Sequence, residues 1–97
     1  MMFSKNYGEI VGLIIVSNER RELCYAMLRG VGDVEQLATE TGLTSDDAKR
    51  NLAGLEAAGA LKSYAKGNRI LYKFTAEGEE AVRDALQPIG PFKPRDG

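Results

Sequence analysis

The sequence predicts one small domain of the α+β class, mostly α-helical with a single β-hairpin. Three observations lead to this prediction. The chain has 97 residues, which is the length of one domain. Apolar residues recur at helical spacing in several segments, and glycines and helix-capping residues separate these segments. One stretch, LKSYAKGNRILYKF, instead reads as two short strands around a Gly-Asn pair.

The first segment, residues 1–16, is mostly apolar. Its β-branched residues permit a strand, but we favour a helix because another helix starts directly after it. That second helix, SNERRELCYAMLRG, can be capped by Ser17 or Asn18, and Gly30 and Gly32 end it. The first segment is too apolar to stay exposed, so we expect it to pack on the domain itself or on a second copy.

Two further helices follow, joined by only Gly42, Leu43 and Thr44. Asp33 is expected to cap the first of them, and Gly42 to end it. Thr44 is expected to cap the second. So close a join, with a glycine in the turn, is typical of a helix-turn-helix, here over residues 33–58.

The hairpin, residues 60–74, is expected to turn at Gly67-Asn68, because both residues reach positive φ readily. Pairing outward from this turn gives the hairpin two faces. The face expected to pack on the core carries Leu61, Ala65, Ile70, Tyr72 and Phe74. A last helix over residues 76–87 completes the domain, which we place at residues 1–87. The tail, 88–97, is expected to be disordered.

The opposite face of the hairpin is strongly basic. It carries Lys62, Lys66, Arg69 and Lys73, with Tyr64 and Leu71 among them. The pairing sets Lys66 opposite Arg69 and Lys62 opposite Lys73, and like charges placed directly opposite destabilise a hairpin. Such pairs make sense where a polyanion neutralises them, and a phosphate backbone is the obvious candidate. The alternative is a solvated lysine-rich edge that discourages aggregation.

The positive charge is local. The whole chain has a net charge of −1, yet residues 44–73 hold six cations against three anions, and the segments on either side are acidic. A polycation that coats nucleic acid is therefore excluded. A patch confined to the second helix of the helix-turn-helix and the hairpin is the charge pattern of a nucleic-acid-binding surface.

The stretch from Val34 to Val82 reads VEQLATETGLTSDDAKRNLAGLEAAGALKSYAKGNRILYKFTAEGEEAV and resembles the winged helix-turn-helix of small prokaryotic transcriptional regulators of the ArsR and MarR types. The most telling pieces are the LxxLxxxGxL join that starts at Leu52 and the LYKFTAEG exit from the hairpin. The resemblance implies that the helix after the turn enters the DNA major groove. It also implies that the hairpin, called the wing, contacts backbone or minor groove, and that the outer N-terminal and C-terminal helices form a homodimer.

The expected DNA-binding residues come from both parts of this motif. Lys49 and Arg50 are expected to reach base edges or phosphate, and Thr44 and Ser45 to bond phosphate. The full expected set is Thr44, Ser45, Lys49, Arg50, Lys62, Lys66, Asn68, Arg69 and Lys73. We expect Arg69→Ala and Lys66→Ala to weaken binding similarly on all DNA sequences, and Arg50→Ala also to change sequence preference.

Other features leave a second function open. Asp46 could accept a hydrogen bond from cytosine N4 or repel phosphate, or Asp46 and Asp47 could only stabilise the helix start. These carboxylates, the acidic total and the small residues Ala53 and Ala57 also permit a winged-helix protein-interaction module that does not bind DNA.

The composition excludes several kinds of site. With no histidine and one cysteine, the chain lacks the ligands of zinc, haem and iron–sulfur sites and a His-based catalytic triad. We expect no cofactor and no enzymatic activity, and we expect Cys24 in the core rather than acting as a redox sensor. The longest apolar run, residues 10–16, is too short to cross a bilayer, so a cytoplasmic location is expected. The sequence identifies no small-molecule effector.

Overall fold

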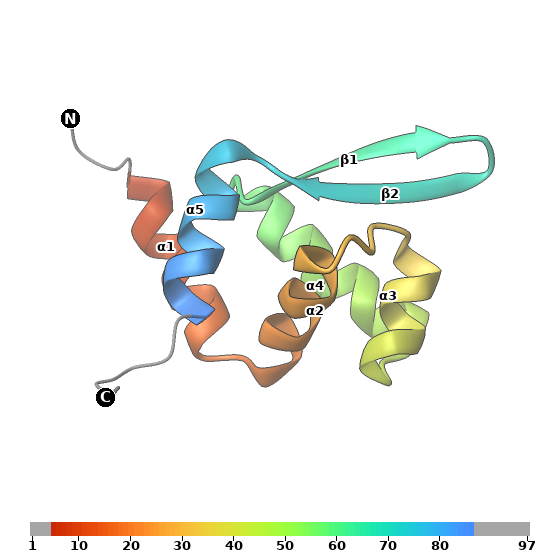
Figure 1. Cartoon of the computed structure of the whole chain (residues 1–97), viewed down its shortest axis with the longest axis horizontal. Helices are drawn as coiled ribbons and strands as arrows, with labels where there is room; N and C mark the ends of the chain where they lie inside the picture. The colour runs from red at the N-terminus through yellow and green to blue at the C-terminus, as the bar shows by residue number, and fades with distance from the viewer. Residues whose placement is uncertain (1–4, 87–97) are drawn as a thin grey trace.

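Within residues 5–86, which the computed structural model describes, the chain forms five helices and one antiparallel hairpin (Figure 1). In chain order the elements are α1 (Lys5–Ile15), α2 (Asn18–Leu28), α3 (Val34–Thr41), α4 (Ser45–Ala57), β1 (Leu61–Lys66), β2 (Arg69–Phe74) and α5 (Ala76–Leu86). This order confirms the mostly helical fold with one hairpin, and the helical choice for the first segment. The tail expected to be disordered, 88–97, lies outside the described residues.

Side-chain caps begin three of the helices where the sequence predicts them. Ser17, Asp33 and Thr44 each have extended backbone and accept a hydrogen bond from a backbone N–H in the first helical turn, at 2.8–3.2 Å. Gly42 ends α3 in the left-handed conformation, with φ of 74°. The turn between α3 and α4 is therefore fixed by local chemistry at both of its ends.

The core lies between two groups of elements. α1 and α5 pack side by side at one end of the molecule, while α2, α3 and α4 form the body beneath the hairpin (Figure 1). The largest fully buried side chains are Ile10, Ile14, Leu23, Cys24, Leu37, Leu52, Leu55 and Val82. The apolar first segment thus buries one face against the domain itself, which is one of the two outcomes that the sequence left open.

Arg20 and Arg21 at the start of α2 hold the end of α1. Arg20 Nε donates to the carbonyl of Leu13 at 2.7 Å, and Arg21 donates to the carbonyls of Ile14 and Ile15. The last carbonyls of a helix lack partners within it and carry partial negative charge, so two guanidinium groups there stabilise the corner between the helices.

The junction between the hairpin and α5 is very closely packed. Thr75 Oγ1 donates to the carbonyl of Gly59 at 2.7 Å and accepts from the backbone N–H of Gly78 at 2.9 Å. A Cβ placed on Gly78 would lie 1.9 Å from the carbonyl oxygen of Ala60. Only glycine therefore allows α5 to start where it does.

The strand register is the one the sequence predicts, from Lys66 opposite Arg69 at the turn to Leu61 opposite Phe74 at the base. Gly67 takes a positive φ of 63° in the turn. The loop before α3 adds a short third pairing to β2, where the backbone N–H of Tyr72 donates to the carbonyl of Gly32 at 2.8 Å. The hairpin, hereafter the wing, is therefore tied to the loop before α3 as well as to α4 and α5.

The prediction that one whole face of the hairpin packs on the core is wrong for its outer half. Leu61 is buried and Tyr72 and Phe74 are half-buried, but Ala65 is exposed and Ile70 is 49% exposed. The reason is geometric, because the outer part of the wing extends past the helical body (Figure 1). Alternation along a strand shows which residues share a face, whereas the elements beneath it decide how far along the strand that face is covered.

Candidate nucleic-acid interface

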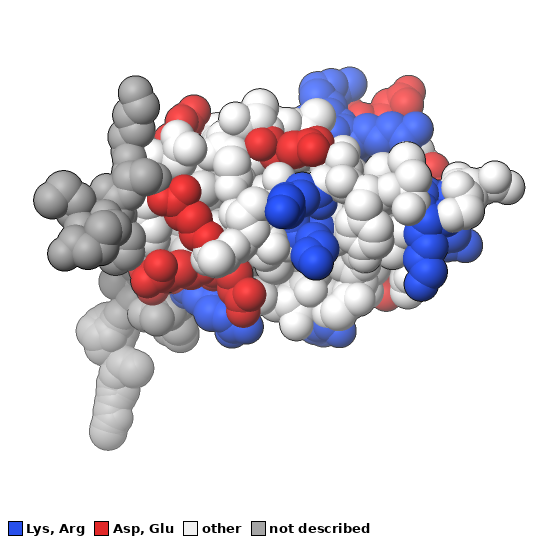
Figure 2. Space-filling model, turned by 90° about the horizontal axis from the view of Figure 1, so that it is seen from above, with Lys and Arg blue, Asp and Glu red and all other residues white. Residues whose placement is uncertain are grey.

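Charge is divided between the two ends of the molecule. Seen from above the wing, basic side chains lie over the wing and toward its tip, while acidic side chains gather over the end that holds α1 and α5 (Figure 2). The described residues of α5 alone include Glu77, Glu79, Glu80 and Asp84. A polyanion would therefore be attracted to the wing and repelled from the opposite end.

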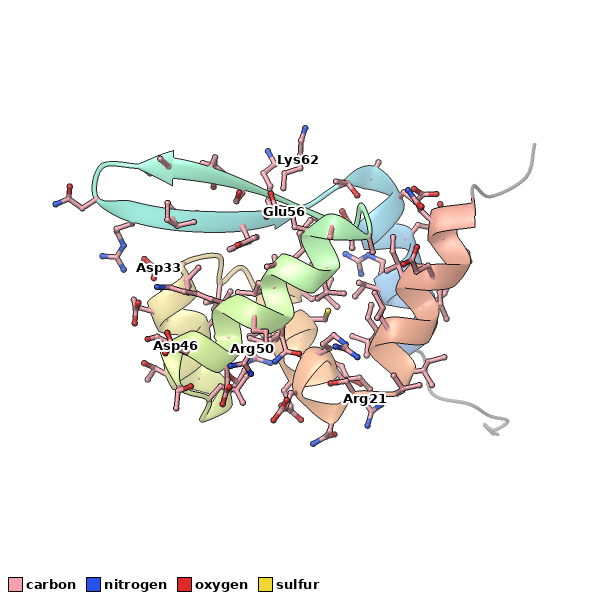
Figure 3. The ribbon with its side chains drawn as sticks, turned by 180° about the vertical axis from the view of Figure 1, so that it is seen from behind. Arg21, Asp33, Asp46, Arg50, Glu56 and Lys62 are labelled. Carbon is pink, nitrogen blue, oxygen red and sulfur yellow. The ribbon has the colours of Figure 1, made fainter. Side chains whose placement is uncertain are left out.

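The outer face of α4 carries charged side chains at one end and very small residues at the other. Ala48, Leu52 and Leu55 are buried beneath the helix. The exposed residues are Asp46, Lys49, Arg50, Ala53, Gly54 and Ala57. Charged side chains thus occupy the N-terminal half of this face, where Asp46 and Arg50 lie (Figure 3), and very small ones the C-terminal half. A helix with so little side-chain bulk can approach a groove closely.

Three of the expected site residues near the start of α4 already have protein partners. Thr44 caps the helix. The hydroxyl of Ser45 donates to Glu35 Oε1 at 2.5 Å, and Arg50 forms an exposed ion pair with Asp47 at 2.9 Å. Exposed pairs of this kind contribute little to stability, so Arg50 can exchange Asp47 for another anion at small cost.

A groove of about 420 Å³ separates the wing tip from the helix-turn-helix. It is lined by Asp33, Val34, Glu35, Lys49, Asn68, Arg69 and Ile70. The structure thus brings together Lys49 from α4 with Asn68 and Arg69 from the wing, three expected site residues from separate parts of the chain. The wing lysines, Lys62, Lys66 and Lys73, are not among the residues that line this groove.

Asp33 is the residue of this groove that sequence reasoning assigned only to a helix cap. Its side chain, labelled in Figure 3, is nearly buried, with 8% exposed. Its Oδ2 accepts a hydrogen bond from Nε of Arg69, whose side chain is 64% exposed. The bond from Arg69 and the backbone N–H groups of Gln36 and Glu35 hold the pKa of Asp33 below its usual value, although burial opposes this shift. The sequence contains no local sign of this contact, because Asp33 and Arg69 are 36 positions apart and meet only in the folded chain.

The lowered pKa of Asp33 predicts a pH dependence of stability. A carboxyl whose pKa is lower in the folded state stabilises the fold fully above its unfolded pKa of about 4 and loses that contribution as pH falls through the folded pKa. We therefore expect the free energy of unfolding to decline in acid, and Asp33→Asn to be less stable at neutral pH with a flatter acid slope. Urea denaturation at a series of pH values from about 2 to 7 would measure both. An unchanged slope would contradict the assignment.

At the base of the wing, Lys62 and Lys73 lie opposite each other beside Tyr64. Lys73 Nζ is 6.0 Å from the centre of the Tyr64 ring, and with Ser63 these residues line a shallow hollow of about 200 Å³. Among residues 5–86, no carboxylate forms an ion pair with Lys62, Lys66 or Lys73. Within that part of the chain these three lysines have no counter-ion, unlike Arg69, which pairs with Asp33.

Other kinds of site find little support in the part of the chain that the structure describes. No group of three potential metal ligands lies together there. Cys24 is fully buried, and burial raises the pKa of its thiol to about 12, against a smaller opposing effect of Arg20, so it is not a thiolate at neutral pH. No helix between residues 5 and 86 combines the length and the apolar character that a membrane span requires.

No protein-family model and no curated protein sequence matches the chain, but solved structures do. The homodimeric winged helix-turn-helix DNA-binding domain of a possible ArsR-family regulator from Mycobacterium bovis superposes with a TM-score of 0.68 at 26% identity, over 81% of this chain and 71% of that one. The crystal structure of the same fragment gives a TM-score of 0.67, also at 26% identity, over 81% and 83%.

Two more distant regulators share the fold. An ArsR-family transcriptional regulator matches with a TM-score of 0.66 at 19% identity, over 89% of each chain. MepR, a transcription regulator from Staphylococcus aureus, matches with a TM-score of 0.56 at 17% identity, over 86% of this chain and 55% of its own. The architecture and these neighbours agree with the resemblance seen in the sequence. The chain has the winged helix-turn-helix fold that is found in ArsR-family transcriptional regulators and in MepR.

Proposed function

We propose that the chain binds double-stranded DNA and acts as a cytoplasmic transcriptional regulator. The observation that carries this proposal is the groove in which α4 and the wing tip meet, with Lys49, Asn68 and Arg69 on its walls and the uncompensated wing lysines beside it. The Mycobacterium bovis neighbour, a DNA-binding domain, supports the same use of the fold.

In the proposed complex α4 lies in the major groove. Lys49 and Arg50 reach base edges from its exposed face, and Arg50 leaves Asp47 to do so. The small residues Ala53 and Gly54 let the helix backbone come close to the groove floor. Thr44 and Ser45 at the helix start approach phosphate, where the positive end of the helix favours an anion.

The wing supplies the second contact. Lys62, Lys66 and Lys73 neutralise backbone phosphates, which relieves the repulsion between Lys62 and Lys73 in the register. Asn68 and Arg69 at the tip reach the adjacent minor groove. Because the contacts of the three lysines are to phosphate, they provide affinity and orientation rather than sequence preference.

We also propose that two copies associate through α1 and α5. These helices lie at the opposite end from the wing tip, so a dimer formed there leaves both wings free (Figure 1). At the end of α1, Ile15 is 52% exposed, and Val16 beside it is 76% exposed, which provides apolar surface for an interface. The homodimeric state of the Mycobacterium bovis domain supports this arrangement, and a dimer would bind a pseudo-palindromic site.

Fluorescence anisotropy with labelled duplexes tests the proposed function. Purified protein is titrated into duplexes from the region upstream of its own gene and into scrambled duplexes, at about 50 mM and 200 mM salt. We expect tighter binding to the upstream duplex, and a loss of affinity of at least about tenfold between the two salt concentrations. The slope of log affinity against log salt should be on the order of −0.9 for each phosphate contacted. Absence of binding to any duplex at the lower salt would contradict DNA binding and favour a protein-interaction module.

A further inference from the structure

One carboxylate joins the helix-turn-helix to the tip of the wing. Asp33 Oδ1 accepts from the backbone N–H groups of Glu35 and Gln36 at 2.8 and 3.2 Å, so this oxygen belongs to the start of α3. The other oxygen, Oδ2, accepts from Arg69 Nε and so belongs to the wing. The two oxygens of a nearly buried side chain therefore connect two elements that are far apart in the sequence.

The backbone next to Asp33 fixes the same connection. The carbonyl of Gly32 accepts from the N–H of Tyr72 at 2.8 Å, and Asp33 itself pairs with Leu71. A Cβ on Gly32 would lie 2.9 Å from the Tyr72 carbonyl oxygen, so the loop and β2 are in close contact at this point. The position of Arg69 relative to α3 is thus determined by main-chain as well as side-chain bonds.

Arg69 is held by one edge of its guanidinium only. Nε is bound to Asp33, and among residues 5–86 no hydrogen bond is found for the two terminal nitrogens. Those nitrogens lie on a side chain that is 64% exposed and that lines the groove shared with Lys49 and Asn68. A planar guanidinium fixed in this way offers its remaining donors in a set direction, whereas a free lysine moves as a point charge.

We propose that Asp33 is a positioning residue that gives Arg69 a role in discriminating between DNA sequences. This inference rests on the proposed DNA-binding function. An arginine held in one position can bind one groove width or one base edge more tightly than another. A mobile arginine, by contrast, is attracted to any phosphate. Arg69 thereby has a different role from the wing lysines, with which the sequence analysis had grouped it.

The test compares affinities for two duplexes, one selected from a random pool by the wild-type chain and one a scramble of the same composition. Asp33→Asn retains an oxygen that can cap α3 but removes the negative partner of Arg69. We expect the specificity ratio, which is the affinity for the selected duplex divided by that for the scrambled one, to fall by about tenfold. Affinity for the scrambled duplex should stay equal or rise, because the variant gains one unit of net positive charge.

Two further variants make the result decisive. Glu40→Gln makes the same change of charge on α3 outside the groove and without touching Arg69, and it should leave the ratio unchanged. Arg69→Lys keeps the charge on an exposed side chain but removes the planar fork, so it should lower the ratio about as much as Asp33→Asn. The double variant Asp33→Asn with Arg69→Lys should lose no more than either single change, because both disrupt one contact.

Each other outcome overturns a stated claim. If Asp33→Asn weakens binding to both duplexes alike, or Arg69→Lys leaves the ratio intact, Asp33 acts only on the fold and the positioning role is wrong. Thermal melts of the variants establish how far the fold is affected. If the wild-type chain itself selects no duplex above the scrambled one, the proposed DNA-binding function fails and the positioning role fails with it.

Discussion

Replacing Gly78 with alanine should lower the free energy of unfolding by about 3 kcal/mol. The added Cβ would lie 1.9 Å from the carbonyl oxygen of Ala60 and 2.7 Å from its Cα, so backbone rather than a flexible side chain would have to move. Ala60 is itself buried, and Thr75 bonds to this same segment. Because small domains are stable by only about 5–15 kcal/mol, equilibrium urea denaturation should show the loss clearly.

Gly54→Ala is the matched control for this substitution. Gly54 is also helical, but it is exposed and no heavy atom lies within 4 Å of the position of its Cβ. Alanine is a better helix former than glycine, so this change should raise stability by up to about 1 kcal/mol. Similar effects of the two substitutions would show that the close approach of α5 to Ala60 is not what makes Gly78 necessary.

The largest expected functional effect comes from removing the three wing lysines for which residues 5–86 provide no counter-ion. With Lys62, Lys66 and Lys73 all changed to alanine, DNA affinity at low salt should fall by about a hundredfold, and almost equally for selected and scrambled duplexes. The slope of log affinity against log salt should become shallower by about 0.9 for each phosphate that the variant no longer neutralises. Anisotropy titrations at several salt concentrations measure the affinity and the slope together.

Arg83→Ala on α5 provides a comparison for the removed charge. Arg83 is exposed and pairs with Glu79 on the acidic half of the molecule, so its removal should leave DNA affinity nearly unchanged. The wing variant should also keep the circular dichroism and melting temperature of the wild type, because the lysines are exposed. An unchanged salt slope in the wing variant would show that DNA does not contact this face of the wing.

The parts of the fold that local chemistry decides could be predicted from the sequence. Caps at Ser17, Asp33 and Thr44 were identified because short polar side chains precede helical apolar patterns. The hairpin register followed from Gly67-Asn68, since a two-residue turn leaves only one way to pair the strands. The basic character of the wing and the exposed face of α4 followed from these elements in turn.

Contacts between distant elements could not be predicted in the same way. Nothing local to Asp33 indicates that its second oxygen binds Arg69, and nothing local to Arg20 indicates that it bonds to a carbonyl of α1. The exposure of Ala65 and Ile70 likewise depends on where the helical body ends beneath the wing. In each case the contact depends on how distant elements pack together, and the periodicity of strands and helices does not indicate that packing.

The bond between Tyr72 and Gly32 also bears on how the chain folds and opens. It closes a loop that contains α3, α4 and the turn of the hairpin, so placing the wing against the helical body requires a contact between residues far apart in the sequence. In native-state hydrogen exchange, the amides of β2 and α3 should then become accessible together, as one cooperative unit. A force applied at the wing tip would accordingly be transmitted to the start of α3, and strain at α3 would be transmitted to the tip.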